Sequence, residues 1–499
     1  MMADVAADVK RVFSMGEKPP QGGGAMSFPP SRAHGRTRLT RLVYSPGDVW
    51  YAGYMIFDPG RLSDFARSHG FHYDRIDPAA LVSDALADMG RGLEGLPSGM
   101  PMIPAHIAPA AGARAGRTVL ALDAGGTNMR VARVSFDGDG RAAAGEERRF
   151  PMPGTGGRVS AERFFDLIAE AALAGGALDG IDGIGFTFSF HMDIRPDADG
   201  VLRAFSKEVD APEVVGRAVG AGLRDALARA GRAYDGPVVL LNDTAATLLA
   251  GVADVTMEGS PAGAGATIGF ILGTGLNIAY PETHIPKIGL GPAGAPQIVV
   301  CETGNFAPRF LGSLDRDFDA STMTPGAYAL EKTVSGAYLG PLILHALKRA
   351  VRDGVLSFAR SAELLSLPSL DTRSADGFLR APFSAGNPLG ALFGRGEEDA
   401  VAAARYLAEI VAERGALFAA CMLTATVERM RFGGARFRPG APARIAVEGS
   451  TFMAFAGMRR AIEAWLHVLL SRKGPTPYVV APVERASLLG AAVAAAGRL

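Results

Sequence analysis

The stretch that most constrains the fold is residues 119–131, where an apolar run breaks at a glycine pair and then resumes. Apolar residues 119–122 are followed by Asp123, and apolar residues return at Val131. Such a run predicts a buried strand, a tight turn and a second strand. We therefore expect a β-hairpin with a carboxylate where its first strand ends.

The turn of this hairpin has the composition of a phosphate-binding turn. Gly125 and Gly126 let the backbone take positive φ angles and leave room for a ligand beside the main chain. Consecutive backbone N–H groups in such a turn suit a phosphate. Asp123 would hold Mg²⁺ through water, since this ion prefers oxygen ligands and keeps part of its hydration shell. An ordinary glycine turn is the alternative, and one short motif does not decide between them.

A second hairpin of the same kind follows at residues 269–277, where Gly273 and Thr274 offer backbone donors and a hydroxyl. Two such turns predict a nucleotide clamp between two lobes. A third segment ends a strand at residues 447–451, where Gly449 and Ser450 would seat the nucleoside end of ATP. For this third segment a plain strand-to-helix turn is the alternative.

The 499 residues exceed what one simple core accommodates, so we expect two or more domains. Two α/β halves, each opening on a glycine turn after a strand, imply a cleft between lobes. Residues 365–397 are expected to be a loop or a partly ordered insertion. Apolar periodicity predicts strands at 119–123, 130–136, 183–188, 238–243, 267–272, 297–302 and 443–448, and helices at 78–93, 213–230, 244–253, 326–351, 398–430, 454–471 and 486–496.

The charge balance and the cysteines narrow the class of protein. Lys+Arg and Asp+Glu both number 51, so nothing predicts an electrostatic grip on nucleic acid or on an anionic membrane. Cys301 and Cys421 form neither a zinc-ligand spacing nor a disulfide framework, which favours the reducing cytoplasm. We expect no signal peptide and no membrane-spanning run.

Segments spread along the chain follow one another in the order of the motifs of a known family. They are LDAGGTNMR (122–130), GFTFSF (185–190), SK (206–207), LNDT (241–244), LGTGLN (272–277), ETGNF (302–306), LEK (330–332), SGAYLG (335–340), EGS (448–450) and GAA (490–492). Over residues 76–499 the chain resembles the hexokinase family, of bacterial type. The resemblance implies an α/β, two-lobed actin-like ATPase (ribonuclease H-like) fold of hexokinase type with an interlobe cleft.

The resemblance also implies a division of the chain into lobes. It gives an N-terminal extension at 1–75, a helix packing on the large lobe at 76–110, a small lobe at 111–242, a large lobe at 243–487 and a C-terminal helix at 488–499 that returns to the small lobe.

Catalytic roles follow from the resemblance position by position. Asp243 would be the general base that accepts the proton of a sugar hydroxyl as its oxygen attacks the γ-phosphate of ATP. Because Asp243 precedes an apolar helix, it is also a candidate N-cap, and both roles can hold together. Lys207 would place positive charge where negative charge develops. Solvated surface is the alternative for a lone loop lysine.

Binding roles come from the same resemblance. Glu302 and Glu331 could also be exposed surface acids, although Glu302 follows a buried run where an unpaired carboxylate is costly. Arg130 would brace the first turn and is not assigned to catalysis. The sugar would be bound by Ser189, Ser206, Lys207, Asn242, Asp243, Asn277, Glu302 and Glu331. Mg-ATP would be bound by Asp123, Gly125, Gly126, Thr127, Asn128, Gly273, Thr274, Gly449 and Ser450.

The walls around the polar sugar-site residues depart from the family pattern. His191 stands where the family usually has proline, Leu276 replaces a serine, and segments 204–208 and 302–306 differ from the usual sequences. His191 could face substrate, with a surface role as the alternative.

We expect an ATP- and Mg²⁺-dependent hexokinase that phosphorylates the 6-hydroxyl of a hexose such as glucose. The alternatives are a kinase of the same fold for another sugar or polyol, and a sugar-responsive regulator without turnover. An actin-like or chaperone ATPase would leave the sugar-directed acids without a purpose.

Overall fold

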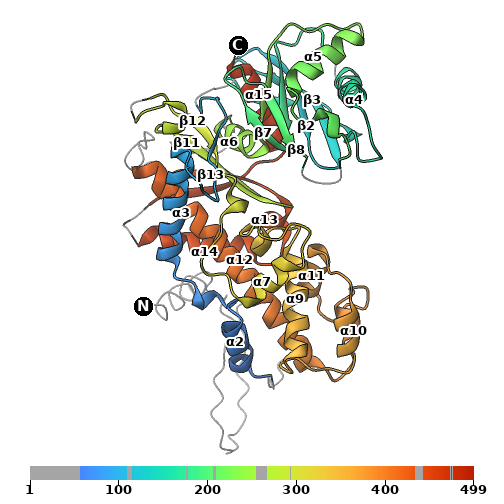
Figure 1. The fold of residues 1–499 in the computed structure, drawn as a ribbon, viewed down its shortest axis with the longest axis vertical. Helices are drawn as coiled ribbons and strands as arrows, with labels where there is room; N and C mark the ends of the chain where they lie inside the picture. The colour runs from blue at the N-terminus through green and yellow to red at the C-terminus, as the bar shows by residue number, and fades with distance from the viewer. Residues whose placement is uncertain are drawn as a thin grey trace, which may run out of the picture.

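The computed structural model describes residues 57–109, 115–175, 178–205, 209–253, 267–292, 294–432, 442–472, 474 and 476–498. Two mixed sheets, each covered by helices, build two lobes that meet along a pair of helices (Figure 1). We call the lobe around the sheet β4-β3-β2-β6-β9 the small lobe, and the lobe around the sheet β1-β12-β11-β10-β13-β14 the large lobe. This arrangement agrees with the predicted α/β fold.

Helices cover both faces of the small-lobe sheet because its strands are apolar on both sides. Along β2, Leu120 and Leu122 face a core shared with α4 and α5, whereas Val119 and Ala121 face a core shared with α15. The bounds are β2 (Thr118–Ala124), β3 (Asn128–Phe136), β4 (Ala142–Ala144), β5 (Arg148–Pro151), β6 (Gly183–Phe188), β9 (Val238–Leu241), α4 (Ala161–Gly175), α5 (Val219–Arg229) and α15 (Ala486–Gly497), with the ribbon β7 (His191–Ile194) and β8 (Gly200–Ala204) beside them.

The large-lobe sheet packs on α6 by one face and on long helices by the other. Its strands are β1 (Ile103–Pro104), β10 (Thr267–Leu272), β11 (Leu276–Glu282), β12 (Gln297–Val300), β13 (Ala443–Glu448) and β14 (Tyr478–Pro482). Its helices are α2 (Pro59–Ser68), α3 (Pro78–Glu94), α6 (Asp243–Ala253), α7 (Ser313–Ala320), α8 (Glu331–Val334), α9 (Leu339–Arg352), α10 (Ser361–Ser366), α11 (Thr372–Arg380), α12 (Glu398–Phe432), α13 (Ser450–Ala454) and α14 (Met458–Ser471). Short 3₁₀ turns lie at Tyr73–Arg75, Pro212–Val214, Pro286–Ile288, Thr303–Asn305 and Gly390–Leu392.

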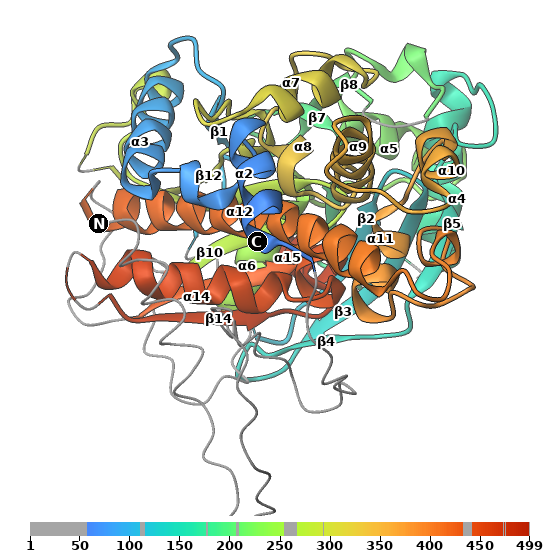
Figure 2. The same cartoon turned by 90° about the horizontal axis from the view of Figure 1, so that it is seen from below.

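The helix α12 is the central element of the large-lobe core, and α14 runs beside it (Figure 2). Residues 398–431 are long and apolar enough to cross a membrane, but 94% of their most apolar window is buried inside the protein. The side chain of Arg414 is fully buried and pairs with both oxygens of Asp315 at 2.8 and 2.6 Å. The length of α12 therefore reflects its place in the core.

Most of the predicted elements are confirmed, and five differ. The strand predicted at 238–243 ends at Leu241, because Asp243 is already the first residue of α6. The helix predicted at 326–351 is two helices, α8 and α9, because the N–H groups of Gly336 and Ala337 donate to the carbonyls of Gly273 and Thr274. The strand predicted at 297–302 ends at Val300, because Glu302 adopts a left-handed conformation with φ 58°. Contacts from distant parts of the chain thus decided these element ends.

Two further predicted helices begin later than expected. The predicted helix at 213–230 is a 3₁₀ turn followed by α5, and the one at 454–471 breaks between α13 and α14 at Gly457, whose φ is 76°. The expectation of a loop or partly ordered insertion at 365–397 is wrong. This segment contains α11, and Leu370, Phe378 and Leu389 are buried in the large-lobe core.

The described part of the predicted N-terminal extension packs as part of the large lobe. Leu62 and Phe65 of α2, together with Phe71, join the core that also contains α12. The lobe boundaries at 75, 110, 242 and 487 stay predictions.

Candidate active site

The first glycine turn joins β2 to β3 and is open to solvent. The N–H of Gly125 donates to the carbonyl of Asn128 at 3.0 Å, and the Asn128 side chain donates to the Thr127 hydroxyl at 3.1 Å. Thr127 and Asn128 are exposed. Neither Gly125 nor Gly126 uses the positive φ angles that glycine permits. What the two glycines supply is a main chain that no Cβ atoms cover.

The second glycine turn joins β10 to β11 and is held from behind. The carbonyl of Gly273 accepts from the N–H of Gly336 at 2.7 Å and from the Thr451 hydroxyl at 2.8 Å. Thr274 is exposed at the tip of the turn. These bonds fix the turn on its inner side and leave its outer side for a ligand.

The third turn, from β13 into α13, packs directly against the second. A Cβ added to Gly273 would lie 3.4 Å from the Cα of Gly449. Gly449 itself has a φ of 128°, and a Cβ there would lie 2.3 Å from the carbonyl oxygen of Leu272. No larger residue fits at position 449 without moving the backbone. The exposed Ser450 follows, so both turns present small residues at one place.

A charged contact joins the first turn to the third across the two lobes. Asp123 is buried at the end of β2, and Arg130 of β3 donates to it from Nε at 2.8 Å. Arg130 Nη2 also lies 4.0 Å from Glu448 Oε1, at the end of β13. Burial raises the pKa of Asp123, and the Arg130 guanidinium opposes this increase. Strand ends from both lobes therefore meet around one arginine.

Asn242, and not Asp243, caps the helix α6. The Asn242 side chain accepts from the N–H of Thr244 at 2.8 Å, and its carbonyl accepts from the N–H of Ala246 at 3.0 Å. Asp243 is the first helical residue and is half-buried, and among the described residues its carboxylate accepts a hydrogen bond only from the Thr244 hydroxyl, at 3.2 Å. The capping alternative for Asp243 is thus wrong, which leaves its carboxylate available.

Asp243 lies at the meeting point of the two lobes. Its charge contributes to raising the pKa of Asp123 in the small lobe and of Glu302 and Glu448 in the large lobe. In each case burial is the largest cause of the increase. These effects place the Asp243 carboxylate close to all three groups, since the influence of a charge falls with distance.

Glu302, Asn277 and Thr303 form a fixed polar group in the large lobe. The Asn277 side chain donates to Glu302 Oε1 at 3.0 Å, and its oxygen accepts from the N–H groups of Ile278 at 2.8 Å and Thr303 at 3.2 Å. Burial raises the pKa of Glu302 to about 7, the bond from Asn277 opposes this, and the charges of Asp243 and Glu331 add to it. Asn277 is therefore oriented, and one oxygen of Glu302 stays available.

Glu331 comes to the same group from the start of α8. Its Oε2 accepts from the N–H of Leu276 at 3.1 Å. Cβ atoms added to Gly275 and Gly304 would lie 2.8 and 3.0 Å from this oxygen. Small residues on both sides thus let Glu331 reach the neighbourhood of Glu302.

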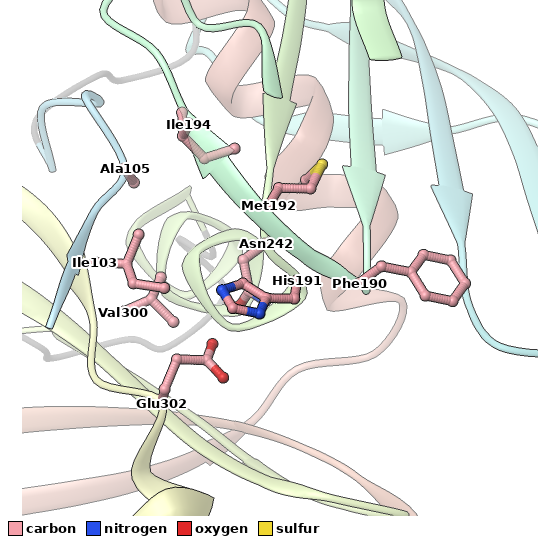
Figure 3. Close-up of a pocket in the computed structure, with 9 residues that line it drawn as sticks. All are labelled: Ile103, Ala105, Phe190, His191, Met192, Ile194, Asn242, Val300 and Glu302. Carbon is pink, nitrogen blue, oxygen red and sulfur yellow. The ribbon is translucent and has the colours of Figure 1, made fainter. Parts of the chain in front are cut away.

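A pocket of about 370 Å³, part of it open to solvent, lies where β7, β12 and the start of α6 converge (Figure 3). Its polar side chains are His191, Asn242 and Glu302. The other lining residues are Ile103, Ala105, Phe190, Met192, Ile194 and Val300. This pocket has walls from both lobes.

The described residues from the predicted set gather in two neighbouring places. The three glycine turns with Asp123 form one, and Asn242, Asn277, Glu302 and Glu331 form the other, with Asp243 between them. Ser189 is half-buried beside the first turn, where its N–H donates to the carbonyl of Ala124 at 3.0 Å. Ser206 and Lys207 lie outside the described residues.

Sequence reasoning did not assign Glu448 to the site, gave Arg130 only the bracing of a turn, and left open whether His191 faces substrate. Glu448 ends a buried strand directly before a glycine turn, as Asp123 does, and this parallel was the available signal. Arg130 pairs with the Asp123 carboxylate, which goes beyond bracing a turn. The inward direction of His191 had no signal in the sequence.

Comparisons with known proteins place this geometry in a family. Two family models, both described as Hexokinase, match residues 68–253 and 267–497. Hexokinase-1 of Oryza sativa subsp. japonica is 31% identical, and the match covers 84% of this chain and 88% of that protein. Hexokinase-2 of Candida albicans is 28% identical, with the same two coverages.

Among solved structures, the hexokinase from Schistosoma mansoni complexed with glucose has a TM-score of 0.69 and covers 88% of this chain and 100% of that one. At 22% identity this likeness shows the fold alone. With the family models and the rice relative, the conclusion is that the chain belongs to the hexokinase family.

Proposed function

We propose that this hexokinase transfers the γ-phosphate of ATP to the 6-hydroxyl of a hexose, glucose first, with Asp243 as the general base. One observation carries the proposal. Asn242 caps α6, so the Asp243 carboxylate is available between the glycine turns and the polar pocket. A general base must lie within hydrogen-bond reach of the hydroxyl that it deprotonates, and that hydroxyl must face the γ-phosphate, so a carboxylate beside both groups suits the role.

The sugar would be held by groups that match its hydroxyls. Each hydroxyl both donates and accepts, so the Glu302 and Glu331 carboxylates would accept and the Asn242 and Asn277 amides would donate. Because Asn277 is already oriented by backbone bonds, little side-chain freedom would be lost on binding. Ser189, Ser206 and Lys207 complete the proposed set.

ATP would lie along the three turns. Backbone donors of Gly125, Gly126 and Gly273 and the hydroxyls of Thr127 and Thr274 would contact phosphates, and Asn128, Gly449 and Ser450 would contact the nucleotide.

The donor set near Asp123 is compatible with Mg²⁺ held through water. Among the described residues, no group of three or more acidic, His or Cys side chains could enclose a metal ion. A single carboxylate suits Mg²⁺, which keeps several waters and takes its other ligands from phosphates. Asp123 would hold the ion, which supplies positive charge to the phosphates.

The chemical step exchanges one bond for another. The sugar O6–H bond breaks and its proton goes to Asp243, a bond forms between O6 and the γ-phosphorus, and the bond from that phosphorus to the bridging oxygen breaks to release ADP. Lys207 would neutralise charge on the transferring group. Closure of the two lobes would exclude water and so protect ATP from hydrolysis.

Asp243→Asn tests this assignment. We expect kcat to fall by roughly 10²–10⁴-fold, the range for loss of a general base, while sugar binding persists because the amide keeps the shape. Turnover is followed by ADP release and by ³¹P NMR of the sugar product, with glucose, mannose, fructose and glucosamine, each with and without Mg²⁺. Sugar binding is measured by calorimetry.

The control is Asp235→Asn, which changes an exposed carboxyl of the small lobe and should leave kcat unaltered. Turnover by Asp243→Asn equal to that of the unmodified protein would contradict the base assignment. A polyol or a non-hexose sugar as the best substrate would favour the alternative kinase. Binding of a sugar without any turnover would favour the regulator.

We place the enzyme in the cytoplasm, where the free thiols of Cys301 and Cys421 stay reduced.

A further inference from the structure

The ribbon β7–β8 carries a histidine into the pocket between the lobes. His191 begins β7 and pairs with Ala204 of β8, and the register shifts between His191 and Met192. A bulge of this kind redirects a side chain. Phe190 and Met192 are buried on either side, whereas His191 is exposed to the pocket.

The imidazole shares the pocket with two groups already assigned to sugar binding. Figure 3 shows the His191 ring projecting from β7 toward the space in which the Glu302 carboxylate and the Asn242 side chain also lie. Within the described part of the chain, these three are the polar side chains that line this pocket. Around them the wall is apolar, so a polar ligand there depends on these three for hydrogen bonds.

The hydrogen-bonding groups that remain are few. One oxygen of Glu302 is occupied by Asn277, and the Asn242 oxygen is occupied by the N–H of Thr244. No hydrogen bond or ion pair of the His191 ring is formed with any residue that the structure describes. The nitrogen of the ring that meets a sugar hydroxyl can therefore either donate to it or accept from it, and a hydroxyl can serve in either role.

We propose that His191 is a specificity-determining residue, whose imidazole hydrogen-bonds to a hydroxyl of the hexose other than the one that reacts. The inference rests on the proposed function and adds a residue to its sugar site. Asp123, Asp243 and Thr274 do not line this pocket, so the hydroxyl bound here lies away from the transferring phosphoryl group. His191 thus acts on sugar binding and choice, and not on the chemical step.

The test combines a variant with sugars that lack single hydroxyls. His191→Ala and the unmodified protein are compared on glucose and on its 1-, 2-, 3- and 4-deoxy analogues. For glucose we expect His191→Ala to raise KM about tenfold, the effect of one hydrogen bond, with kcat within about twofold. For one deoxy analogue alone, His191→Ala should raise KM no further than the missing hydroxyl already does, because that hydroxyl is the hydrogen-bond partner of His191.

His191→Gln should recover part of the glucose affinity, since its amide also donates and accepts. The control His467→Ala removes an exposed histidine of α14 and should change nothing. If His191→Ala raised KM equally for every sugar, or for none of them, the proposal would be overturned, because neither result identifies a hydroxyl that pairs with His191.

Calorimetry separates this inference from the proposed function. Sugar affinities are measured on the Asp243→Asn background, where turnover does not contribute. If the unmodified protein binds glucose but never phosphorylates it, the proposed function fails and His191 is judged on affinity alone. If glucose is phosphorylated and no analogue shows coupling to His191, the specificity role fails while the kinase assignment stands.

Discussion

Glu302 is a buried carboxyl whose surroundings disfavour its negative charge. It lies two residues beyond the buried strand β12, takes a left-handed backbone conformation and lies near two further carboxylates. Burial and those neighbours raise its pKa to about 7, against the favourable bond from Asn277. Holding such a group in place without substrate costs stability, a cost often found at functional sites.

This shift predicts a pH dependence of folding that Glu302→Gln should reduce. The pKa of this carboxyl is its ordinary 4.5 in the unfolded chain but about 7 in the folded one, so the folded state holds an extra proton between those values. The free energy of unfolding should therefore fall as pH rises from about 4.5 to about 7 and then level off, by roughly 1–3 kcal/mol from this group.

Urea unfolding of the sugar-free protein at pH 5 and pH 8 measures the effect. Glu302→Gln should flatten the difference between the two, whereas the exposed Glu94→Gln should keep it. Identical pH dependence in Glu302→Gln and the unmodified protein would show that Glu302 titrates normally in the folded state.

At the scale of elements, the second and third glycine turns act as one unit. The segment between α8 and α9 donates two backbone bonds to the second turn, and Gly449 of the third packs on the carbonyl of Leu272. The helix predicted across this segment is interrupted where those bonds form. The nucleotide side of the site is thus assembled from three separate segments of the large lobe.

Gly449→Ala should disrupt this unit. The added Cβ would lie 2.3 Å from the carbonyl oxygen of Leu272, and the φ of 128° is itself strained for alanine. We expect a loss of stability of about 2–4 kcal/mol and a raised KM for ATP, with a smaller change in KM for glucose.

The matched control is Gly396→Ala, at an exposed position with a φ of 85° and no atom within 4 Å of the added Cβ. It carries the cost of the positive φ alone, about 1–2 kcal/mol. Equal thermal shifts for the two variants would mean that the contact with Leu272 has no energetic weight.

At the scale of the whole molecule, α6 and α15 are the joint between the lobes. α15 packs on β2 and β6 of the small-lobe sheet, while α6 packs on β10 and β13 of the large-lobe sheet. The two helices cross so closely that a Cβ at Gly490 would lie 1.9 Å from the carbonyl oxygen of Ala246. Any change in this crossing therefore moves one sheet relative to the other.

Gly490→Ala should separate the two helices and misplace the lobes. We expect a destabilisation of about 1–3 kcal/mol from overpacking, and a loss in kcat/KM because the small-lobe turn and the large-lobe turns no longer face one another. Thermal unfolding and steady-state kinetics measure the two effects.

Gly90→Ala in α3 is the control, because an added Cβ there meets nothing within 4 Å and the helix propensity of alanine favours it by up to about 1 kcal/mol. If Gly490→Ala were as stable and as active as Gly90→Ala, the close crossing would not set the lobe arrangement.

The sequence by itself determined most strands of the two large sheets, most of the helices, the two hairpins and the family. These depend on local patterns, such as apolar periodicity and a glycine after a strand, and on the order of short motifs. The strand at 183–188 and the strand at 443–448 were predicted to the residue. The gathering of Asn242, Asn277, Glu302 and Glu331 in one place followed from the family resemblance and not from spacing.

Only the tertiary structure decided the rest. Asn242 caps α6 and leaves the Asp243 carboxylate available, and Gly336 interrupts the predicted helix where it bonds to the second turn. Residues 365–397 pack into the core, and His191 points into the pocket. These features depend on how segments far apart in the chain come together. A local pattern reports what a segment can form alone. Which carbonyl, carboxylate or side chain it meets is fixed by packing, because a buried polar group takes whichever partner the folded chain brings within reach.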